Sequence, residues 1–367
     1  MDWQTGPAKG YMKYRTILIT GGAGFIGSNL AISFKQKYPS VKIIALDNLK
    51  RRGSELNLLR LKENGVEFVH GDIRAPEDLI LNTKIDLLIE CSAEPSVLSG
   101  LDNNPLYIIN TNLTGTINCL ELARKNKADV VFLSTSRVYP YEPINNIKTK
   151  ELETRFDWAS GQEINGWSKV GIDIDFTTQG PKTFYGATKL ASELLLQEYI
   201  TNYGIKGVIN RCGVIAGPWQ FGKVDQGIFT FWMLAHYFKK NVKYIGFGGR
   251  GKQVRDILHV QDLFELINLQ IVAINRISGN IYNVGGSREG SLSLLETTKL
   301  CEQITGNRLK IASDKINRPG DIKIYLSDNR KVKQDLAWQP KKLPREILFD
   351  IYSWINKNGN QVKASLK

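Results

Sequence analysis

The first 212 residues alternate between short apolar runs and longer segments in which apolar residues recur every three or four positions. The first pattern is typical of buried strands and the second of amphipathic helices. Their alternation predicts an α/β fold with a doubly wound parallel sheet covered by helices on both faces. The expected strands lie at 16–20, 41–46, 68–72, 86–90, 129–134 and 207–211, and the expected helices at 25–34, 112–126 and 188–204.

One stretch interrupts this alternation. Residues 141–183 form a polar segment that is too long to be an ordinary connection in a compact domain. Such a loop is either functional or disordered, and Trp158 and Trp167 favour a segment that packs. Beyond residue 212, dense glycines and aromatic residues indicate a smaller second domain of mixed α/β structure. We expect a first domain at 1–212 that also receives about 252–285, and a second at 213–251 and 286–367.

A glycine-rich turn directly follows the first expected strand. Read from Gly22, the sequence GGAGFIG contains the pattern GxGxxG, which ends at Gly27. Glycine permits tight turns and close approach of the backbone to a ligand. A helix N-terminus behind such a turn is a site for a pyrophosphate. Because glycine-rich turns also arise for purely steric reasons, the motif is weak by itself.

Acidic residues after the next two strands add support for a dinucleotide site. Asp47 lies 20 residues after Gly27, the spacing at which a carboxylate meets the ribose 2′-hydroxyl of NAD. This carboxylate would repel the 2′-phosphate of NADP, although three basic residues at 50–52 soften that preference. Asp72 at the end of the third strand either meets the adenine or caps a helix. Together these features predict a Rossmann-type domain with NAD as cofactor.

Composition limits the partners. The chain has 367 residues and a formal net charge of +13, which favours anionic ligands. It has no arginine-rich tract or alternating aromatic and basic segment, so we expect no nucleic-acid partner. No segment approaches the roughly 18 uninterrupted apolar residues of a membrane span, and residues 1–15 lack the apolar core of a secretory signal. We therefore expect a cytoplasmic protein with no membrane association.

The cysteines and histidines do not form a metal motif. Cys91, Cys119, Cys212 and Cys301 lie far apart in the sequence, and three of them have apolar surroundings. Reduced core thiols are the expected state. With only three histidines besides, no cluster has the spacing of a zinc site, and we expect no metal cofactor.

Tyr185 and Lys189 form the candidate catalytic motif. They lie four residues apart on an expected helix and therefore on one face. A lysine ammonium, together with a positively charged nicotinamide, stabilises a phenolate and lowers the tyrosine pKa from about 10 towards working pH. Such a tyrosine moves a hydroxyl proton. YxxxK alone is common by chance, but here the strand VVFLSTS also offers Ser134, Thr135 and Ser136 as hydroxyl partners.

With these motifs, the chain resembles the extended short-chain dehydrogenase/reductase family, the NAD-dependent epimerases and dehydratases, from Thr16 to about Lys357. The matching stretches are TGGAGFIG, STSRVY, YGATK, NLTGT, GPWQF and GRGKQVRDILHVQD. The resemblance implies that Thr135, Tyr185 and Lys189 are catalytic and that Asn112 is structural. It implies that the residues that bind NAD are Gly21, Gly24, Phe25, Ile26, Asp47, Asn48, Asp72, Ile73, Cys91, Ser92, Ala93, Ser134, Tyr185 and Lys189.

Within the family, the chain is most similar to the branch of CDP-tyvelose (CDP-paratose) 2-epimerases. The shared stretches are DNLKRRGSELNL, EFVHGDIR, ELETRF, DQG at 225–227, GKQVRDILH, SLSLLE and RPGDIKIYLSD. The long segment before Tyr185 is also shared, although the 50 residues from Thr135 to Tyr185 exceed what we expect of this branch. We expect that segment to cover the sugar. The residues implied for the substrate are Glu94, Ser136, Arg137, Gln220, Gln226, Arg255 and Arg318.

Three departures from the family pattern concern the walls of the expected site. Family members usually read HLAG or HLAA where this chain has Glu90-Cys91-Ser92-Ala93. An asparagine and a lysine follow the threonine in the 2-epimerases, whereas Ser136 and Arg137 stand here. Ala216 replaces the tyrosine that usually precedes GP. The first departure makes the nicotinamide-side wall chemically different. Together the changes leave the cofactor chemistry intact, but they leave the particular sugar open.

The resemblance implies an isomerase that retains NAD and epimerises C2 of a CDP-3,6-dideoxyhexose, a sugar of lipopolysaccharide or other surface polysaccharides. Arg255 and Arg318 are expected to hold the diphosphate, because guanidinium groups match phosphate oxygens in bidentate fashion. The alternative for both is a surface ion pair.

Three other functions compete. A 4,6-dehydratase would need the Asp-Glu pair of that branch after the threonine, where Ser136 and Arg137 stand. A 4-epimerase or a decarboxylase of another nucleotide sugar needs only the residues already named. A non-catalytic NAD-binding sensor or scaffold would typically have lost the tyrosine or the lysine. The family also implies a homodimer or homotetramer built on helices around 114–125 and 189–203.

Overall fold

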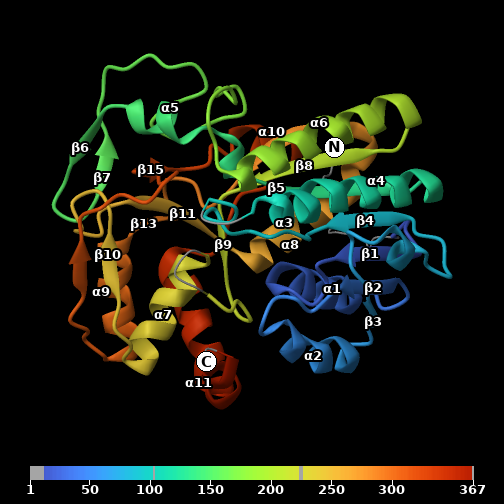
Figure 1. Cartoon of the computed structure of the whole chain (residues 1–367), viewed down its shortest axis with the longest axis horizontal. Helices are drawn as coiled ribbons and strands as arrows, with labels where there is room; N and C mark the ends of the chain where they lie inside the picture. The colour runs from blue at the N-terminus through green and yellow to red at the C-terminus, as the bar shows by residue number, and fades with distance from the viewer. Residues whose placement is uncertain (1–11, 102–103, 223–225, 366–367) are drawn as a thin grey trace, which may run out of the picture.

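The structure is a computed structural model that describes residues 12–101, 104–222 and 226–365. A sheet of seven parallel strands forms its larger part, in the order β12-β8-β5-β4-β1-β2-β3 (Figure 1). This confirms the expected doubly wound α/β fold. The strands are β1 (Thr16–Thr20), β2 (Lys42–Asp47), β3 (Glu67–His70), β4 (Leu87–Glu90), β5 (Asp129–Thr135), β8 (Gly207–Cys212) and β12 (Ile281–Val284).

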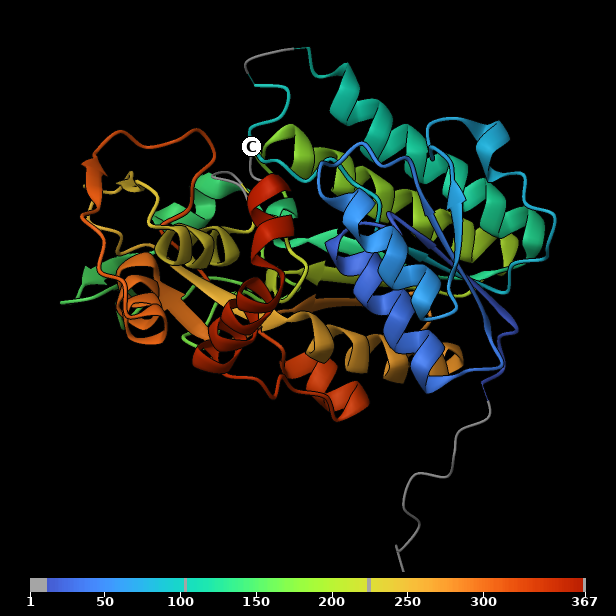
Figure 2. The same ribbon diagram turned by 90° about the horizontal axis from the view of Figure 1, so that it is seen from below.

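Helices cover both faces of this sheet, as Figure 2 shows. On one face lie α1 (Phe25–Lys37), α2 (Asn57–Glu63), α8 (Val260–Ile277) and α10 (Arg330–Leu336). On the other lie α3 (Leu106–Ile109), α4 (Gly115–Asn126) and α6 (Phe184–Tyr203). A π-helical turn, η3 (Asn110–Thr114), joins α3 to α4. Short 3-10 helices are η1 (Ser54–Leu56), η2 (Pro76–Leu79) and η4 (Ser136–Val138).

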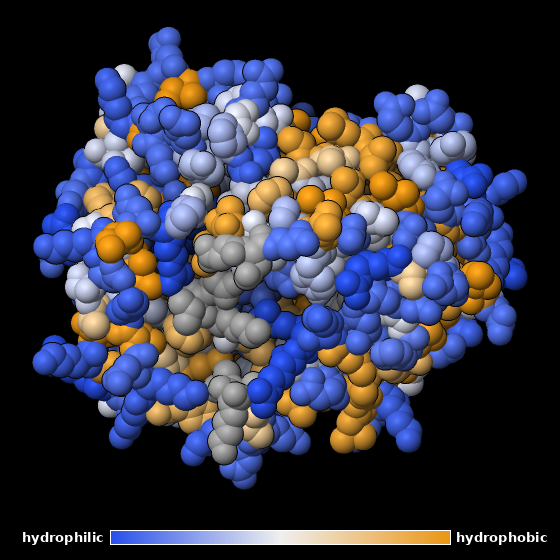
Figure 3. All heavy atoms as spheres, viewed as in Figure 1, coloured by the Kyte–Doolittle hydropathy of each residue, from blue (hydrophilic) through white to orange (hydrophobic). Residues whose placement is uncertain are grey.

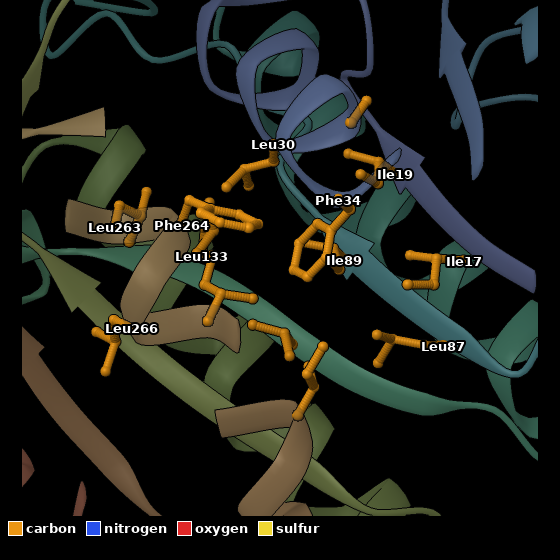
Figure 4. Packing of buried hydrophobic residues seen from close by; sticks show 14 of the residues in the cluster. Ile17, Ile19, Leu30, Phe34, Leu87, Ile89, Leu133, Leu263, Phe264 and Leu266 are labelled. Carbon is orange, nitrogen blue, oxygen red and sulfur yellow. The ribbon is translucent and has the colours of Figure 1, made fainter. Parts of the chain in front are cut away.

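The side chains of β1 alternate between two apolar cores, one on each face of the sheet. Ile17 and Ile19 point to the α1 and α8 face and are fully buried, whereas Leu18 packs on the opposite side. Figure 4 shows Phe34 of α1 against Phe264 of α8, whose ring centroids lie 4.9 Å apart in an edge-on arrangement. Aromatic pairs of this geometry stabilise a core beyond the area they bury.

A smaller mixed α/β unit follows β8. Its sheet has the order β13-β11-β15, and β9 also pairs with β11. Its strands are β9 (Val214–Ala216), β11 (Val254–His259), β13 (Ser291–Ser293) and β15 (Ile324–Tyr325), with a separate pair of β10 (Lys243–Ile245) and β14 (Ala312–Asp314). Its helices are α7 (Ile228–Phe238), α9 (Leu294–Thr305) and α11 (Pro344–Ser365), which pack together around one apolar cluster.

The expected domain limits need two corrections. We expected about 252–285 to return to the larger unit, but β11 lies in the smaller sheet, and the return begins with α8. We also placed 330–336 in the smaller unit, whereas α10 packs on β12 and α8. Strand pairing and helix docking are decided by distant partners, which the local pattern does not contain.

The long segment 141–183 was assigned to the first domain, but it packs on the smaller unit. It forms α5 (Tyr141–Asn146) and a hairpin of β6 (Thr149–Glu151) and β7 (Phe156–Trp158), which lies near β15 in Figure 1. Trp158 meets Trp167 edge-on, and Phe156 and Phe176 join the cluster of Ile324 and Leu326. The segment is therefore ordered and packed, as its tryptophans indicated.

An apolar patch covers α6 in the space-filling view (Figure 3). Leu194 and Tyr203 are 58% and 56% exposed, and Leu106 of the adjoining α3 is 55% exposed. Burial of such side chains against a second copy would remove apolar surface from water. We predict a homo-oligomer through α4 and α6. Light scattering that gives a monomer mass at every concentration would reject this prediction.

No helix in the described ranges has the length and apolar character required to cross a membrane. The four cysteines are free thiols, three of them buried. Within the same ranges, His, Cys, Asp and Glu side chains form no group of three that is arranged to hold a metal ion.

Candidate active site

Two adjoining cavities lie at the carboxyl ends of the parallel strands, where open α/β sheets bind their ligands. The first, of about 590 Å³, is lined from the glycine turn to Tyr185 and Lys189. The second, of about 570 Å³, is lined by apolar side chains of α7 and β13 together with arginines. Arg137, Val214 and Gln226 belong to the walls of both cavities. The arrangement provides one long site with two compartments.

The glycine turn forms one end of the first cavity. Gly21 has a positive φ of 62°, which favours glycine. A Cβ on Gly22 would lie 2.6 Å from the Cα of Ala45, and a Cβ on Gly27 would lie 2.2 Å from the carbonyl oxygen of Gly21. No side chain caps the N-terminus of α1 at Gly24. The turn therefore meets the steric requirement for glycine, and its uncapped helix N-terminus fits the pyrophosphate of NAD.

The acidic residues after β2 and β3 line the same cavity. Asp47 is 9% exposed, and its carboxylate accepts hydrogen bonds from the backbone N–H of Ala23 and Leu49 at 3.1 and 2.7 Å. Burial raises the pKa of Asp47. Asp72 accepts from Asn48 at 2.9 Å, and Arg74 holds the pKa of Asp72 well below its usual value. Asp72 thus caps no α-helix of the described residues. It forms hydrogen bonds with Asn48 and Arg74 in the wall of the first cavity.

Tyr185, Thr135 and Lys189 meet in the first cavity. Lys189 follows Tyr185 by one turn of α6, and Thr135 ends β5. Thr135 is close enough to the Tyr185 hydroxyl to influence its pKa, and its own Oγ1 accepts a hydrogen bond from the backbone N–H of Arg137 at 3.2 Å. Burial raises the pKa of Tyr185, while Lys189, Thr135 and Arg137 act to lower it. Among the protein's own groups, withdrawal from water outweighs the nearby positive charges, and the lowering expected from Lys189 together with a nicotinamide stays a prediction.

Lys189 has a buried partner that the sequence did not lead us to expect. Its Nζ lies 3.3 Å from Oε2 of Glu90 and 3.4 Å from the carbonyl oxygen of Ser92. Glu90 is fully buried and Lys189 is 1% exposed. The departure at Glu90 was visible in the sequence, but its pairing with a residue 99 positions later was not.

Glu193 and Arg211 form a second buried ion pair behind the site. Their closest N–O distance is 2.7 Å, and Glu193 also accepts a hydrogen bond from the Ser134 hydroxyl. Arg211 donates to the Tyr139 hydroxyl at 3.1 Å. Sequence reasoning missed this support, although Glu193 continues the four-residue spacing of Tyr185 and Lys189 along α6 and so lies on the same face.

Asn112 supports the loop after β4, in line with the structural role that the resemblance implied. It is fully buried in the π-helical turn η3. Its side chain accepts from the backbone N–H of Glu94 at 2.7 Å and donates to the carbonyl oxygen of Glu94 at 3.1 Å. It also donates to Thr188 on α6 at 3.3 Å. Turns of this kind are frequent at functional sites.

The residues expected to bind substrate line the two cavities. Glu94, Ser136 and Gln220 line the first cavity, Arg255 and Arg318 the second, and Arg137 and Gln226 both. Arg255 pairs with Asp321 at 2.9 Å inside the cavity wall, and burial lowers the pKa of Arg255 to about 10. Of the DQG stretch, residue 225 lies outside the described residues.

Every residue expected to bind NAD also lines the first cavity. The fold and the site thus define an NAD-binding α/β protein in which a tyrosine–lysine pair lines the cofactor cavity. Residues 17–285 match the NAD dependent epimerase/dehydratase family, and the chain belongs to that family. Its cofactor is therefore NAD, and its class is that of the nucleotide-sugar epimerases and dehydratases.

Individual relatives show how wide this family is. The chain is 32% identical to the CDP-paratose 2-epimerase of Salmonella typhi over 346 residues, which cover 92% of this chain and 98% of that protein. It is 26% identical to the dTDP-glucose 4,6-dehydratase of Escherichia coli over 93% of this chain and 94% of the other. The crystal structure of UDP-glucose 4-epimerase from Thermotoga maritima superposes with a TM-score of 0.75 at 24% identity, over 94% and 99% of the two chains.

Proposed function

We propose that this protein is an NAD-dependent epimerase that inverts C2 of a CDP-3,6-dideoxyhexose, of the CDP-paratose and CDP-tyvelose type. The observation that carries the proposal is the meeting of Tyr185, Thr135 and Lys189 beside the glycine turn, in a cavity that adjoins a second, arginine-lined one. The 32% identity to a CDP-paratose 2-epimerase over nearly the whole of both chains supports the choice of sugar and carbon.

The chemistry divides between cofactor and protein. NAD, when bound in the first cavity, would supply the hydride acceptor and donor for the sugar carbon. Tyr185 accepts the proton of the hydroxyl on that same carbon during oxidation and gives it back during reduction, as a general base and then a general acid. Thr135 orients the Tyr185 hydroxyl, and the ammonium of Lys189 stabilises the phenolate.

The second cavity suits a nucleoside diphosphate. Arg137, Arg255 and Arg318 all line it, and guanidinium groups bind phosphate oxygens in bidentate geometry. Phe229, Phe231 and Trp232 supply apolar surface for a base and its ribose. The boundary with the first cavity is formed in part by Arg137 and Gln226, so a diphosphate bound there would direct its sugar towards Tyr185.

A 4,6-dehydratase fits this site less well. Elimination of water needs an acid and a base, which that branch supplies as Asp-Glu after the threonine. Here Ser136 has no carboxylate, and Arg137 donates through its guanidinium to the carbonyl oxygen of Gly320 at 3.0 Å. A 4-epimerase needs no further group and remains the alternative. Incubation with CDP-paratose, CDP-tyvelose and UDP-glucose, followed by NMR of the sugar, distinguishes the carbons.

NAD is expected to co-purify with the protein and to be preferred over NADP, because an epimerase must keep its hydride and because Asp47 faces the cavity. Chromatography of the nucleotide released on denaturation measures both. Gly27→Ala should abolish retention, since its Cβ would lie 2.2 Å from the oxygen of Gly21. Gly359→Ala is the matched control, with no atom nearer than 3.9 Å. Release of NADP, or a freely exchanging cofactor, would contradict the prediction.

A further inference from the structure

The buried pair of Glu90 and Lys189 places a negative charge beneath the catalytic centre. Glu90 ends β4, which lies between β1 and β5 in the middle of the sheet. Its carboxylate has no exposure to solvent, and its Oε2 lies 3.3 Å from the Lys189 ammonium. A carboxylate withdrawn from water at this distance stabilises the ammonium and also offsets its electric field on neighbouring groups.

One neighbouring group on which the charge of Lys189 acts is Tyr185, which lies one turn earlier on α6. The titratable and charged side chains that face it are Lys189 on its own helix, Arg137 in η4, Cys212 at the end of β8 and, behind Lys189, Glu90 at the end of β4. Of these, Glu90 is the carboxylate, and it acts on Tyr185 through Lys189. Burial raises the pKa of Glu90, and Lys189 lowers it, as expected for an ion pair in a dry site.

We propose that Glu90 is a positioning residue that sets the ionisation of Tyr185 by partly neutralising Lys189. Tyr185 then stays protonated to a higher pH than Lys189 alone would allow, which keeps the phenol ready to return its proton to the sugar. The inference rests on the proposed role of Tyr185. It is particular to this chain, because family members usually carry the histidine of HLAG or HLAA at this position.

The test follows the phenol directly. The NAD-loaded protein is labelled with ¹³C at tyrosine Cζ, and the Tyr185 signal is assigned by its loss in Tyr185→Phe. In Glu90→Gln, the amide oxygen still accepts a hydrogen bond from Lys189, so the ammonium stays charged while its counter-charge is gone. The midpoint of the Tyr185 titration is expected to fall by about one pH unit or more.

Three further variants make the result decisive. Glu90→Asp keeps the charge and should keep a midpoint near that of the wild type. Glu198→Gln removes an exposed carboxylate on α6 and should change nothing. If Glu90→Gln does not fold, Glu90→His takes its place above pH 7, with the same expected fall. An unchanged or raised midpoint, or a Tyr185 that ionises in neither protein below pH 11, overturns the proposal.

The titration of Tyr185 is measured without any nucleotide sugar. A protein that fails to epimerise any nucleotide sugar can still show the shift in the Tyr185 midpoint, and an active epimerase can fail to show it. The two proposals therefore fail separately.

Discussion

Replacement of Tyr185 by phenylalanine is expected to lower turnover by about 10²- to 10⁴-fold, the range associated with loss of a general acid or base. The change removes one hydroxyl from a side chain that lines the first cavity, and within the part of the chain that the structure describes this hydroxyl makes no hydrogen bond that supports the fold. NAD retention and the free energy of unfolding should therefore be close to those of the wild type. Steady-state turnover of the accepted nucleotide sugar measures the effect.

Thr135→Ala provides a graded comparison. It should lower turnover less than Tyr185→Phe, because Thr135 orients the hydroxyl and does not itself carry the proton. The assay must follow the sugar, since an epimerase regenerates its cofactor in each cycle and gives little net absorbance change. Full activity of the Tyr185→Phe variant would refute the mechanism while leaving the fold untouched.

Glu193→Ala is expected to destabilise the protein by about 3 to 5 kcal/mol, the cost of leaving one member of a buried ion pair without its partner. Arg211 is 5% exposed and donates to Glu193 from both Nε and Nη2, at 3.0 and 2.7 Å. Without that carboxylate, its charge would remain buried between β5 and α6. Urea unfolding followed by circular dichroism, at a fixed NAD concentration, measures the loss.

Glu198→Ala is the matched control on the same helix. Its side chain is exposed and hydrogen-bonds Asn202 one turn later, so the change should stay within about 0.5 kcal/mol. A double variant, Glu193→Leu with Arg211→Met, should recover much of the stability, because a well-packed apolar pair often replaces a buried ion pair without loss. A loss below about 1 kcal/mol in Glu193→Ala would show that the pair is not the support described here.

The sequence predicted the larger unit well because its signals are local. Strand β1, the turn at Gly22 to Gly27 and helix α1 are adjacent, and each has its own periodicity or glycine spacing. The same holds for Tyr185 and Lys189, which one helix brings together. The first cavity could thus be outlined from short motifs alone.

The parts that the sequence did not predict depend on distant partners. β11 carries the strongest motif of the smaller unit, yet its sheet is decided by pairing with Ser291–Ser293 and Ile324–Tyr325. The partner of Lys189 lies at the end of β4, 99 positions earlier in the chain. The net pKa direction of Tyr185 depends on its withdrawal from water, which requires the packed structure. For Arg255, the sequence left two alternatives, binding of the diphosphate or a surface ion pair. The structure has a feature of each, because Arg255 forms an ion pair with Asp321 and this pair lies in the wall of the second cavity.

We propose that the sugar is oxidised and re-reduced at C2 within one bound complex. The direct test is conversion of CDP-paratose labelled with deuterium at C2, followed by NMR of the product in ordinary water. A retained NAD would hold the C2 hydrogen between the two steps, while Tyr185 handles only the hydroxyl proton, so we expect a product that is inverted at C2 and retains its deuterium. Inversion at another carbon, loss of the deuterium to water, or no inversion of the nucleotide sugar would contradict this proposal.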